Sequence, residues 1–474
     1  MAIAVICDLF CTLWLIATAM RKGFGSALGL AAALLLVFPS GSRIPLPGLF
    51  DLTTQRVIVV VLVGLYLGIG RKNSGESADG PIPMRYLLSA LLLWMLLSSA
   101  QSVVPAISFK STLSQYFDFC ALYIIYARSI RSREEFETVL SGFVAGMFVC
   151  SIFGLLEIYR DWKVTSLFPE VASRFADLES VDSRGVRVES TFDHAILFGA
   201  ALSMSIPMAL HFVTSAKTAW KKMYLWCALL VMLLCIYKTS SRGPWIALLM
   251  SVIVLAVFGR GKLRSTIAII GVLMAVILVA RPGIRDSIMS LYGETMDPDS
   301  PQGESYQWRY VLYHIAHEQL SQSAQRGLLG FGPESFYYLG LTADVSVDGE
   351  MHTVKVESCD SSMVELMMET GYVGFFLVAL ILLTAIYSTL RAYFRSSKEN
   401  GNLPLVLLVN LCAFSFLMSN VALFGWGQQS YMLWILLAMA MCLPKFIGAE
   451  ARNVSHVKLR TIESPFPIAS YSQE

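Results

Sequence analysis

Charged residues are scarce in this sequence. Asp, Glu, Lys and Arg make up 15% of its 474 residues, against about a quarter in a soluble domain, while hydrophobic residues make up 55%. The mean hydropathy is +0.61. The formal net charge is only +2, so the chain lacks the basic surface typical of nucleic-acid binding. This composition excludes an ordinary soluble domain and indicates an integral membrane protein with no nucleic-acid partner.

Several motifs of known chemistry are also missing. There is no P-loop and no dinucleotide-binding fingerprint, so we expect no nucleotide cofactor. There is no HExxH or CxxC spacing, so we expect no metal site. Eight of the nine cysteines lie in or beside apolar runs and Cys359 stands alone in a polar segment, so we expect no disulfide. No small-residue cleavage site follows the first apolar run, so we expect no cleavable signal peptide.

Long apolar runs dominate the sequence instead. Many extend for about fifteen to twenty residues without a charge, which fits membrane-spanning helices and not the alternating strands of a barrel. We therefore predict an all-α polytopic membrane protein with about 12–13 transmembrane helices. The candidate spans are 3–20, 26–39, 57–70, 86–100, 112–127, 137–157, 193–213, 223–238, 244–259, 265–281, 371–390, 403–422 and 428–446.

Basic residues predict the orientation of these spans. They cluster in alternate loops, which the positive-inside rule assigns to the cytoplasm. With thirteen spans the N-terminus then lies outside and the C-terminus inside. The predicted parts are an N-terminal transmembrane bundle (1–280, with an outward loop at 158–192), a large outward loop (281–370), C-terminal transmembrane helices (371–446) and a cytoplasmic tail (447–474). The polar composition of the tail predicts disorder.

The large loop carries most of the polar chemistry. It holds fourteen acidic and five basic residues, which an otherwise apolar chain keeps only where the segment meets water. Apolar residues at helical spacing predict an amphipathic helix over 306–325. A turn-rich stretch, 327–335, follows. The loop ends in a polar helix start at Asp360 that continues into an apolar span.

Arg242 is the first candidate for binding an anion. It lies at the outward junction of two spans, where an arginine is costly and cannot move far from the membrane surface. Gly243 permits close backbone approach, and Pro244 suits the first turn of a helix. A helix N-terminus beside a guanidinium is a ready phosphate site. The alternative is an interfacial arginine that extends to lipid headgroups.

Three further arginines lie on the outward side. Arg184 and Arg187 precede the span that follows Thr191, and together with Arg242 they are candidates for binding one anionic group. The alternative for Arg184 is ordinary juxtamembrane charge. Arg309 lies on the predicted amphipathic helix. It can reach the same anion or pair with a neighbouring acid on its own helix.

Asp360 is the candidate acid–base residue. Its carboxylate at the outer mouth of a span would accept a proton from an attacking hydroxyl. The alternative is structural, since Ser362 to Glu365 fits a capping box and an aspartate favours a helix start in any case. Glu365 and Glu369 point about 140° away from Asp360 on an ideal helix, so we expect them to be poorer partners. His352 and Glu357 are further candidates for contacting substrate.

Four segments occur in order around the large loop. They are Arg187 ahead of Ser190–Ala195, Thr239–Ala247 with its Ser-Arg-Gly, Glu304–Phe336 with Arg309 and a Gly-Phe-Gly-Pro turn, and Asp360–Gly374. Together they resemble the bacterial O-antigen ligase and O-antigen polymerase superfamily over about residues 180–380.

The resemblance implies a GT-C-like, metal-independent glycosyltransferase of the bacterial inner membrane, with its active site facing the periplasm. Its substrates would be undecaprenyl-diphosphate-linked glycans in the lipid bilayer, and its partners a chain-length regulator and a flippase. Arg187, Arg242 and Arg309 would hold the lipid diphosphate. Ligases of this superfamily carry a His-Asn pair where this chain has Asp360 and Ser361. This departure favours a polymerase of O-antigen, capsule or exopolysaccharide over a ligase that transfers glycan to lipid A core.

Two other classes of protein stay open. A transporter of lipid-linked glycans would place charges inside mid-span cavities and show two pseudo-symmetric halves. Here mid-span charge is sparse, with Asp118 the main example, and no internal repeat is evident. An assembly protein that uses the acidic loop for docking is the third possibility. The collection of polar residues at one face favours the enzyme.

Overall fold

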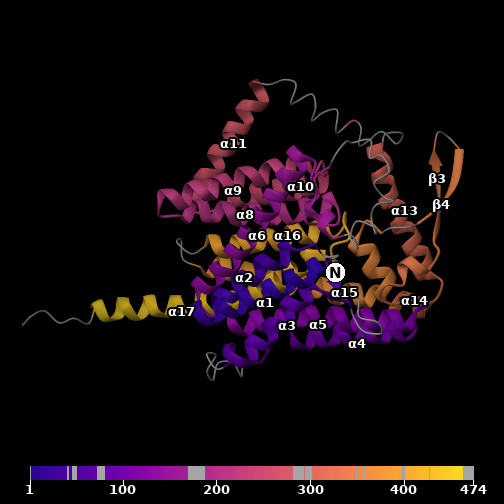
Figure 1. Cartoon of the computed structure of the whole chain (residues 1–474), viewed down its shortest axis with the longest axis horizontal. Helices are drawn as coiled ribbons and strands as arrows, with labels where there is room; N and C mark the ends of the chain where they lie inside the picture. Colours follow the sequence, from indigo (N-terminus) through magenta and orange to yellow (C-terminus); the bar gives the residue numbers. More distant parts are fainter. Residues whose placement is uncertain are drawn as a thin grey trace, which may run out of the picture.

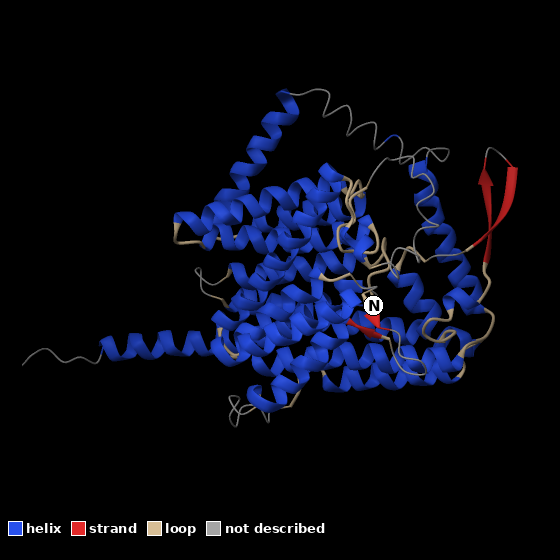
Figure 2. Cartoon of the chain, viewed as in Figure 1, coloured by secondary structure: helices blue, strands red, loops and turns tan. Residues whose placement is uncertain are grey.

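The protein is an all-α polytopic membrane protein. The computed structural model describes residues 2–39, 42–44, 51–71, 81–168, 187–280, 293, 301–347, 350–356, 359–396, 401–425 and 427–462. Its helices run roughly side by side in one bundle, and the polar loop elements gather at one end of it (Figure 1). The described strands form two small two-stranded antiparallel sheets, coloured red in Figure 2.

Each of the thirteen predicted spans overlaps a helix, although the span at 403–422 extends five residues past the end of its helix. These helices are α1 (Ala2–Lys22), α2 (Phe24–Val37), α3 (Thr54–Leu65, continued by the π-helical turn Tyr66–Gly70), α4 (Arg85–Ala100), α5 (Pro105–Ser129), α6 (Arg133–Arg160), α8 (Ala195–Ser215), α9 (Ala219–Lys238), α10 (Arg242–Phe258), α11 (Lys262–Ala280), α15 (Ser362–Arg395), α16 (Asn402–Leu417) and α17 (Gly427–Ile462). Among the described residues, α1, α6, α8, α9 and α15 are long and apolar enough to cross a membrane by themselves.

Small residues bring the central helices into close contact. A Cβ added at Gly142 of α6 would overlap the carbonyl oxygen of Gly29 in α2, and one at Gly146 would lie 2.7 Å from the Ala33 carbonyl oxygen. Close backbone approach of this kind is how helices associate in lipid, where no hydrophobic force drives them together. The short helix α2 is therefore a buried centre of the bundle, although it has only 14 residues.

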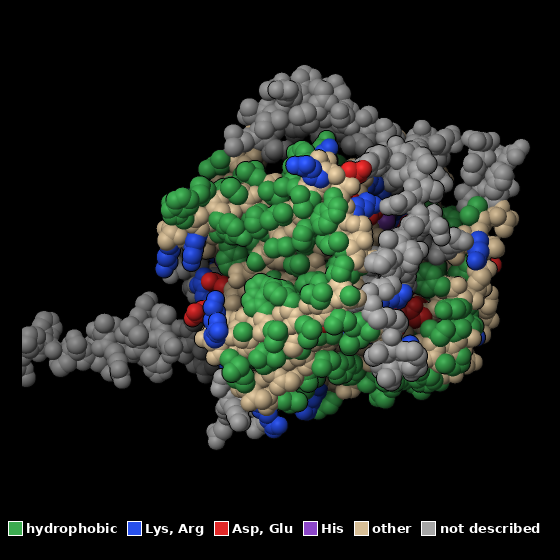
Figure 3. All heavy atoms as spheres, viewed as in Figure 1, with side chains coloured by type: hydrophobic (Ala, Val, Ile, Leu, Met, Phe, Trp, Pro, Cys, Tyr) green, Lys and Arg blue, Asp and Glu red, His purple; other side chains and the backbone are tan. Residues whose placement is uncertain are grey.

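The two ends of the bundle differ in charge. We call the end that carries residues 301–356 the loop end, and the opposite end the basic end. Basic residues mark the basic end in the last turns of α1, α5 and α15 and at the start of α11. Several Lys and Arg side chains gather at the left edge of the face in Figure 3, whereas hydrophobic side chains cover much of its flank. This distribution fits helices that cross a bilayer with their flanks in lipid.

The charge distribution predicts which end a membrane-impermeant reagent reaches. We expect such a maleimide to label Gln322→Cys, at an exposed position directly after α13, in cells whose outer membrane is permeabilised. It should label Lys262→Cys, exposed at the start of α11, only after lysis. Peptide mapping by mass spectrometry separates both signals from the native cysteines. The reverse labelling pattern would contradict the predicted orientation.

The large loop has a small core of its own. Its described elements are α13 (Pro301–Ser321), α14 (Ala324–Leu329), a 3-10 turn (Phe336–Tyr338) and the hairpin β3 (Thr342–Val347) and β4 (Glu350–Lys355). Leu312 and Leu320 of α13 are buried in this core against Val364 and Met368 of α15. The prediction of an amphipathic helix is thus confirmed, although the turn that follows begins at Gly330 and not at Gly327.

Two features of the fold differ from the sequence predictions. The hairpin β3–β4 was not predicted, and its strands pair in register from Thr342 opposite Lys355 to Val347 opposite Glu350. The tail was predicted to be disordered from Gly448, yet α17 continues to Ile462. Ala449, Glu450 and Ala451 are good helix formers, and neither glycine nor proline interrupts the chain between there and Ile462. The polar composition was therefore a poor guide to this segment.

Candidate functional site

Arg187 and Arg242 meet at the start of α10. Arg187 donates hydrogen bonds from Nε to the Thr239 carbonyl (3.0 Å) and from Nη2 to the Ser241 hydroxyl (2.7 Å). Ser241 is the N-cap residue of α10, and Arg242 is the first residue of that helix. The two guanidinium-bearing residues, 55 positions apart in sequence, are thus linked through a single serine. Both are half-buried at the loop end of the bundle.

The segment that carries Arg187 is fixed by buried hydrogen bonds. The Glu157 carboxylate, at the end of α6, accepts from the backbone N–H groups of Glu189 and Ser190. The Ser190 hydroxyl donates to the Cys150 carbonyl (2.6 Å), and Gln428 of α17 donates to the Thr191 carbonyl (2.8 Å). Contacts with several helices hold the backbone here, so the side chain of Arg187 extends from a rigid segment.

The first turn of α10 packs closely on its neighbours. Gly199 of α8 leaves room for Pro244, because a Cβ at Gly199 would lie 2.9 Å from the Pro244 ring. A Cβ at Gly243 would lie 3.8 Å from Leu417 and from the side chain of Asn420. Arg242 therefore stands beside the end of α16, where the helix macrodipole of α10 is positive.

The start of α15 is hydrogen-bonded to the turn that follows α16. Met363 N–H donates to the Met418 carbonyl (3.2 Å), and Ser362 N–H to the Val421 carbonyl (3.1 Å). The Ser362 hydroxyl donates to the Val421 carbonyl (3.0 Å) and accepts from Phe424 N–H (2.9 Å). Residues 417–424, which we call the bridging turn, therefore connect α10 to α15. Arg242 and Asp360 belong to helix starts on either side of it.

Arg309 comes to this place from the large loop. It lies on α13 four residues before Tyr313, so the two side chains share one face of the helix. The Tyr313 hydroxyl lies 3.4 Å from the Ser361 hydroxyl, directly beside Asp360. The structure thus brings α13 with Arg309 to the start of α15. Arg309 is half-buried there.

Asp360 lies before the helix and not in it. The N-cap of α15 is Ser361, whose hydroxyl accepts from Val364 N–H (3.4 Å), so the predicted capping box of Ser362 and Glu365 is wrong. Asp360 is half-buried, two residues before the first helical residue. Its direction is therefore not given by the helical wheel used in the sequence prediction. Asp360 remains a candidate acid–base residue beside the bridging turn.

A group of carboxyls near Asp360 was missed by the sequence reasoning. Glu365 is buried in the first turn of α15, and a carboxylate oxygen of Glu369 accepts from Glu334 N–H (2.6 Å). The Ser111 hydroxyl donates to Glu334 Oε1 (3.1 Å). Burial and the nearby Glu365 raise the pKa of the Cys359 thiol well above its ordinary value, so this cysteine is a neutral thiol at physiological pH. The sequence reasoning missed this group because Glu334 and Glu369 are 35 residues apart and no local pattern predicts their contact.

A break in α15 lies beside this group of glutamates. Gly371 has φ +67°, and the three carbonyls before it accept from neighbours outside the helix. Phe331 N–H and Gly332 N–H donate to Met368 O and Glu369 O (both 2.8 Å), and Trp94 Nε1 of α4 donates to Thr370 O (2.9 Å). The Gly-Phe-Gly-Pro turn of the loop is thus bonded to the backbone at the break.

Unusual backbone conformations gather at the same place. Five non-glycine residues have positive φ in the described part of the chain, and three of them lie in the site: Ser190, Ser240 and Glu334. Each is rare for an L-residue and persists only where the surrounding structure holds it. Such strain is typical of functional sites, which supports placing one here.

The remaining predicted site residues are Arg184, Glu357 and His352. Arg184 and Glu357 lie outside the described residues. His352 lies in β4, opposite Val345, in a hairpin that projects away from the bundle and from α10 (Figure 1). The backbone of this hairpin therefore lies away from the anion site. Within the described ranges, no three His, Cys, Asp or Glu side chains converge as metal ligands.

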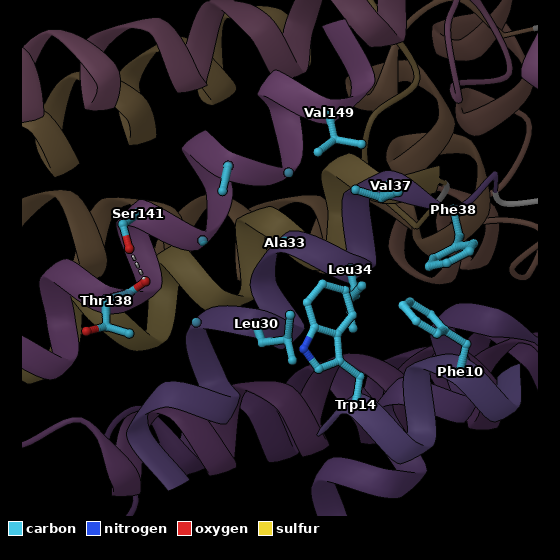
Figure 4. A pocket seen from close by; sticks show the side chains of 14 residues that line it. Phe10, Trp14, Leu30, Ala33, Leu34, Val37, Phe38, Thr138, Ser141 and Val149 are labelled. Atoms are coloured by element: carbon cyan, nitrogen blue, oxygen red, sulfur yellow. Dashed lines mark hydrogen bonds between the residues drawn. The ribbon is translucent and has the colours of Figure 1, made fainter. Parts of the chain in front are cut away.

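A separate pocket of about 420 Å³ lies between α1, α2 and α6. Phe10, Trp14 and Phe38 line one side of it (Figure 4). Thr138 and Ser141 add hydroxyls, but these donate to carbonyls of their own helix (both 2.8 Å). The lining offers apolar contact and almost no hydrogen bonding. The pocket suits a hydrocarbon chain and is not the site of polar chemistry.

Comparison with known families identifies the segment that holds most of this site. Residues 227–379 match the family model described as O-antigen ligase. This match supports the resemblance to the O-antigen ligase and polymerase superfamily. The matched segment contains Arg242, Arg309 and Asp360, whereas Arg187 precedes it. No curated protein matches the chain.

Proposed function

We propose that this chain is a glycosyltransferase of the O-antigen ligase and polymerase superfamily that joins lipid-linked oligosaccharide units into a polysaccharide. The donor would be a glycan on undecaprenyl diphosphate in the bacterial inner membrane, and the product an O-antigen, capsule or exopolysaccharide. The observation that carries the proposal is the contact of Arg187 with the N-cap of α10, directly before Arg242. Arginines at a helix N-terminus form a site for a diphosphate.

The reaction that suits this site is a displacement at the anomeric carbon of the donor glycan. A hydroxyl oxygen of the acceptor sugar forms the new bond to that carbon, and the bond from carbon to diphosphate breaks. The diphosphate leaves with the electron pair, and the arginines stabilise the charge that develops on it. The hydroxyl proton passes to the Asp360 carboxylate. These residues lie at the loop end, which the positive-inside rule predicts to face the periplasm.

Transfer to a different acceptor is the second candidate function. The family model is described as O-antigen ligase, which favours transfer of a finished glycan to lipid A core. Asp360 and Ser361 occupy the place where the resemblance leads us to expect a His-Asn pair. This departure is our reason for placing the polymerase first.

A reaction with purified protein separates the candidates. The protein in detergent is mixed with the undecaprenyl-diphosphate-linked repeat units of its own host, without nucleotide and with EDTA. A ladder of longer lipid-linked glycans supports the polymerase. Transfer to added lipid A core, without a ladder, supports the ligase. If neither product forms while the protein transports lipid-linked glycan in vesicles, the enzyme proposal is wrong.

Asp360→Asn tests the acid–base role. The substitution keeps the size of the side chain but removes its basicity, so we expect kcat to fall by about 100-fold or more. The KM for the donor should change little, because the arginines remain. Initial rates of ladder formation measure both constants. An Asp360→Asn protein with the rate of the wild type would leave Asp360 only a structural role before α15.

A further inference from the structure

One face of α5 is polar over the half that lies toward the loop end. Ser108, Ser111, Gln115 and Asp118 follow one another at intervals of three, four and three residues, which places them on one side of the helix. The opposite side carries exposed apolar residues, namely Phe109, Leu113 and Phe117. A helix that only contacted lipid and apolar neighbours would not need such a face. The polar side of α5 therefore faces something that forms hydrogen bonds.

This face extends from the glutamates of the candidate site, at Glu334, into the bundle. At one end the Ser108 hydroxyl donates to the Pro333 carbonyl (2.6 Å), and Ser111 donates to Glu334. In the middle, Gln115 Nε2 donates to the Ser111 hydroxyl (2.9 Å). At the other end Asp118 Oδ2 accepts from Arg56 Nε of α3 (2.9 Å). Because Arg56 and Asp118 balance each other, the face has polar groups but little net charge.

One carboxylate oxygen on this face has no hydrogen-bond partner among the described residues. It is Oδ1 of Asp118, a residue that is 2% exposed. Buried polar groups in proteins nearly always have a partner, so this oxygen indicates a polar molecule that binds here. Gln115 is half-exposed and therefore accessible to it.

The bridging turn places this face next to the candidate reaction site. Asn420 lies within the turn, against Gly243 beside Arg242. Gly425 directly follows the turn, and a Cβ there would lie 3.3 Å from the Gln115 Oε1. Phe424, next to it, is a half-exposed aromatic ring. The bridging turn therefore has contacts both with the start of α10 and with the polar face of α5.

We propose that the polar face of α5, with Ser111 and Gln115 at its centre, is the binding subsite for the acceptor glycan. This proposal rests on the proposed glycosyltransferase function. Serine hydroxyls and glutamine amides donate and accept in the pattern that sugar hydroxyls require. The balanced charge suits a neutral polyhydroxyl chain and not the diphosphate, which binds at the arginines. Phe424 offers an apolar surface to the C–H face of a sugar ring.

The test separates binding of the acceptor from binding of the donor. The donor is the lipid-linked repeat unit, and the acceptor is the same oligosaccharide released by mild acid and labelled fluorescently at its reducing end. For Gln115→Leu we expect the KM for the acceptor to rise about tenfold, the loss of one good hydrogen bond. The KM for the donor and kcat at saturating acceptor should stay within about twofold. Ser111→Ala should show the same pattern more weakly.

Gln322→Leu is the matched control. Gln322 is an exposed glutamine directly after α13 that donates only to Gln319, and the same substitution there should leave both KM values unchanged. Equal melting temperatures and elution volumes in detergent show that the variants fold. If the wild type elongates the acceptor and Gln115→Leu and Ser111→Ala keep the wild-type KM, the subsite proposal is wrong. If the wild type transfers nothing, the proposed function itself fails.

Discussion

Arg242→Ala should lower the rate of glycan transfer by about 100- to 1000-fold while the protein still inserts and folds. This magnitude is what enzymes lose when one group that stabilises charge in the transition state is removed. Arg242 is the first residue of α10, where its guanidinium and the positive end of the helix act on the same leaving group. Initial rates with purified protein give the effect on kcat and KM separately.

Two further variants make this prediction specific. Arg242→Lys keeps the charge but not the planar pair of donors, so its rate should fall between those of Arg242→Ala and the wild type. Arg264→Ala removes an exposed arginine at the basic end and should have no effect. An Arg242→Ala protein that is present at normal levels and makes polymer of normal length at the normal rate would exclude the diphosphate-binding role.

The sequence was sufficient to predict most of the helices. Long uncharged runs have few physical solutions in a bilayer, and each of the thirteen runs overlaps a helix. It was also sufficient to single out Arg187, Arg242 and Asp360, because polar residues at the boundary of an apolar span are costly and need a reason. The apolar runs do not predict which helices pack against each other. The link from Arg187 through Ser241 to Arg242 therefore appears only in the structure.

Other features depended on contacts between distant parts of the chain. Glu369 was set aside because an ideal helix points it away from Asp360, but that argument assumed that the helix begins at Asp360. The helix begins two residues later, and Glu369 meets Glu334 of the loop instead. Likewise, Gln115 and Arg56 belong to no recognisable sequence motif. Their position is defined by the packing of α5 against α3 and the bridging turn, which no local pattern encodes.

Gly371→Ala should abolish activity by separating the loop from the membrane helices. Gly371 has φ +67°, a conformation that costs an L-residue about 1–2 kcal/mol, and a Cβ there would overlap the Leu328 carbonyl oxygen. Relief of that overlap requires α14 to move away from α15. The hydrogen bonds of Phe331 and Gly332 to the break would then be lost, and Glu334 would move away from Glu369. We expect a total loss of stability of about 2–5 kcal/mol.

Thermal melting in detergent and transfer rates measure this effect together. Gly64→Ala is the control, because Gly64 lies within α3 with open space around its Cα and should gain about 0.5–1 kcal/mol from the substitution. A Gly371→Ala protein that melts like the wild type would mean that the loop does not rest on this break. If the variant instead melts early and is inactive, while Gly64→Ala is active, the loop must be bonded to α15 for catalysis. The site is then a joint product of the loop and the membrane helices, and neither part forms it alone.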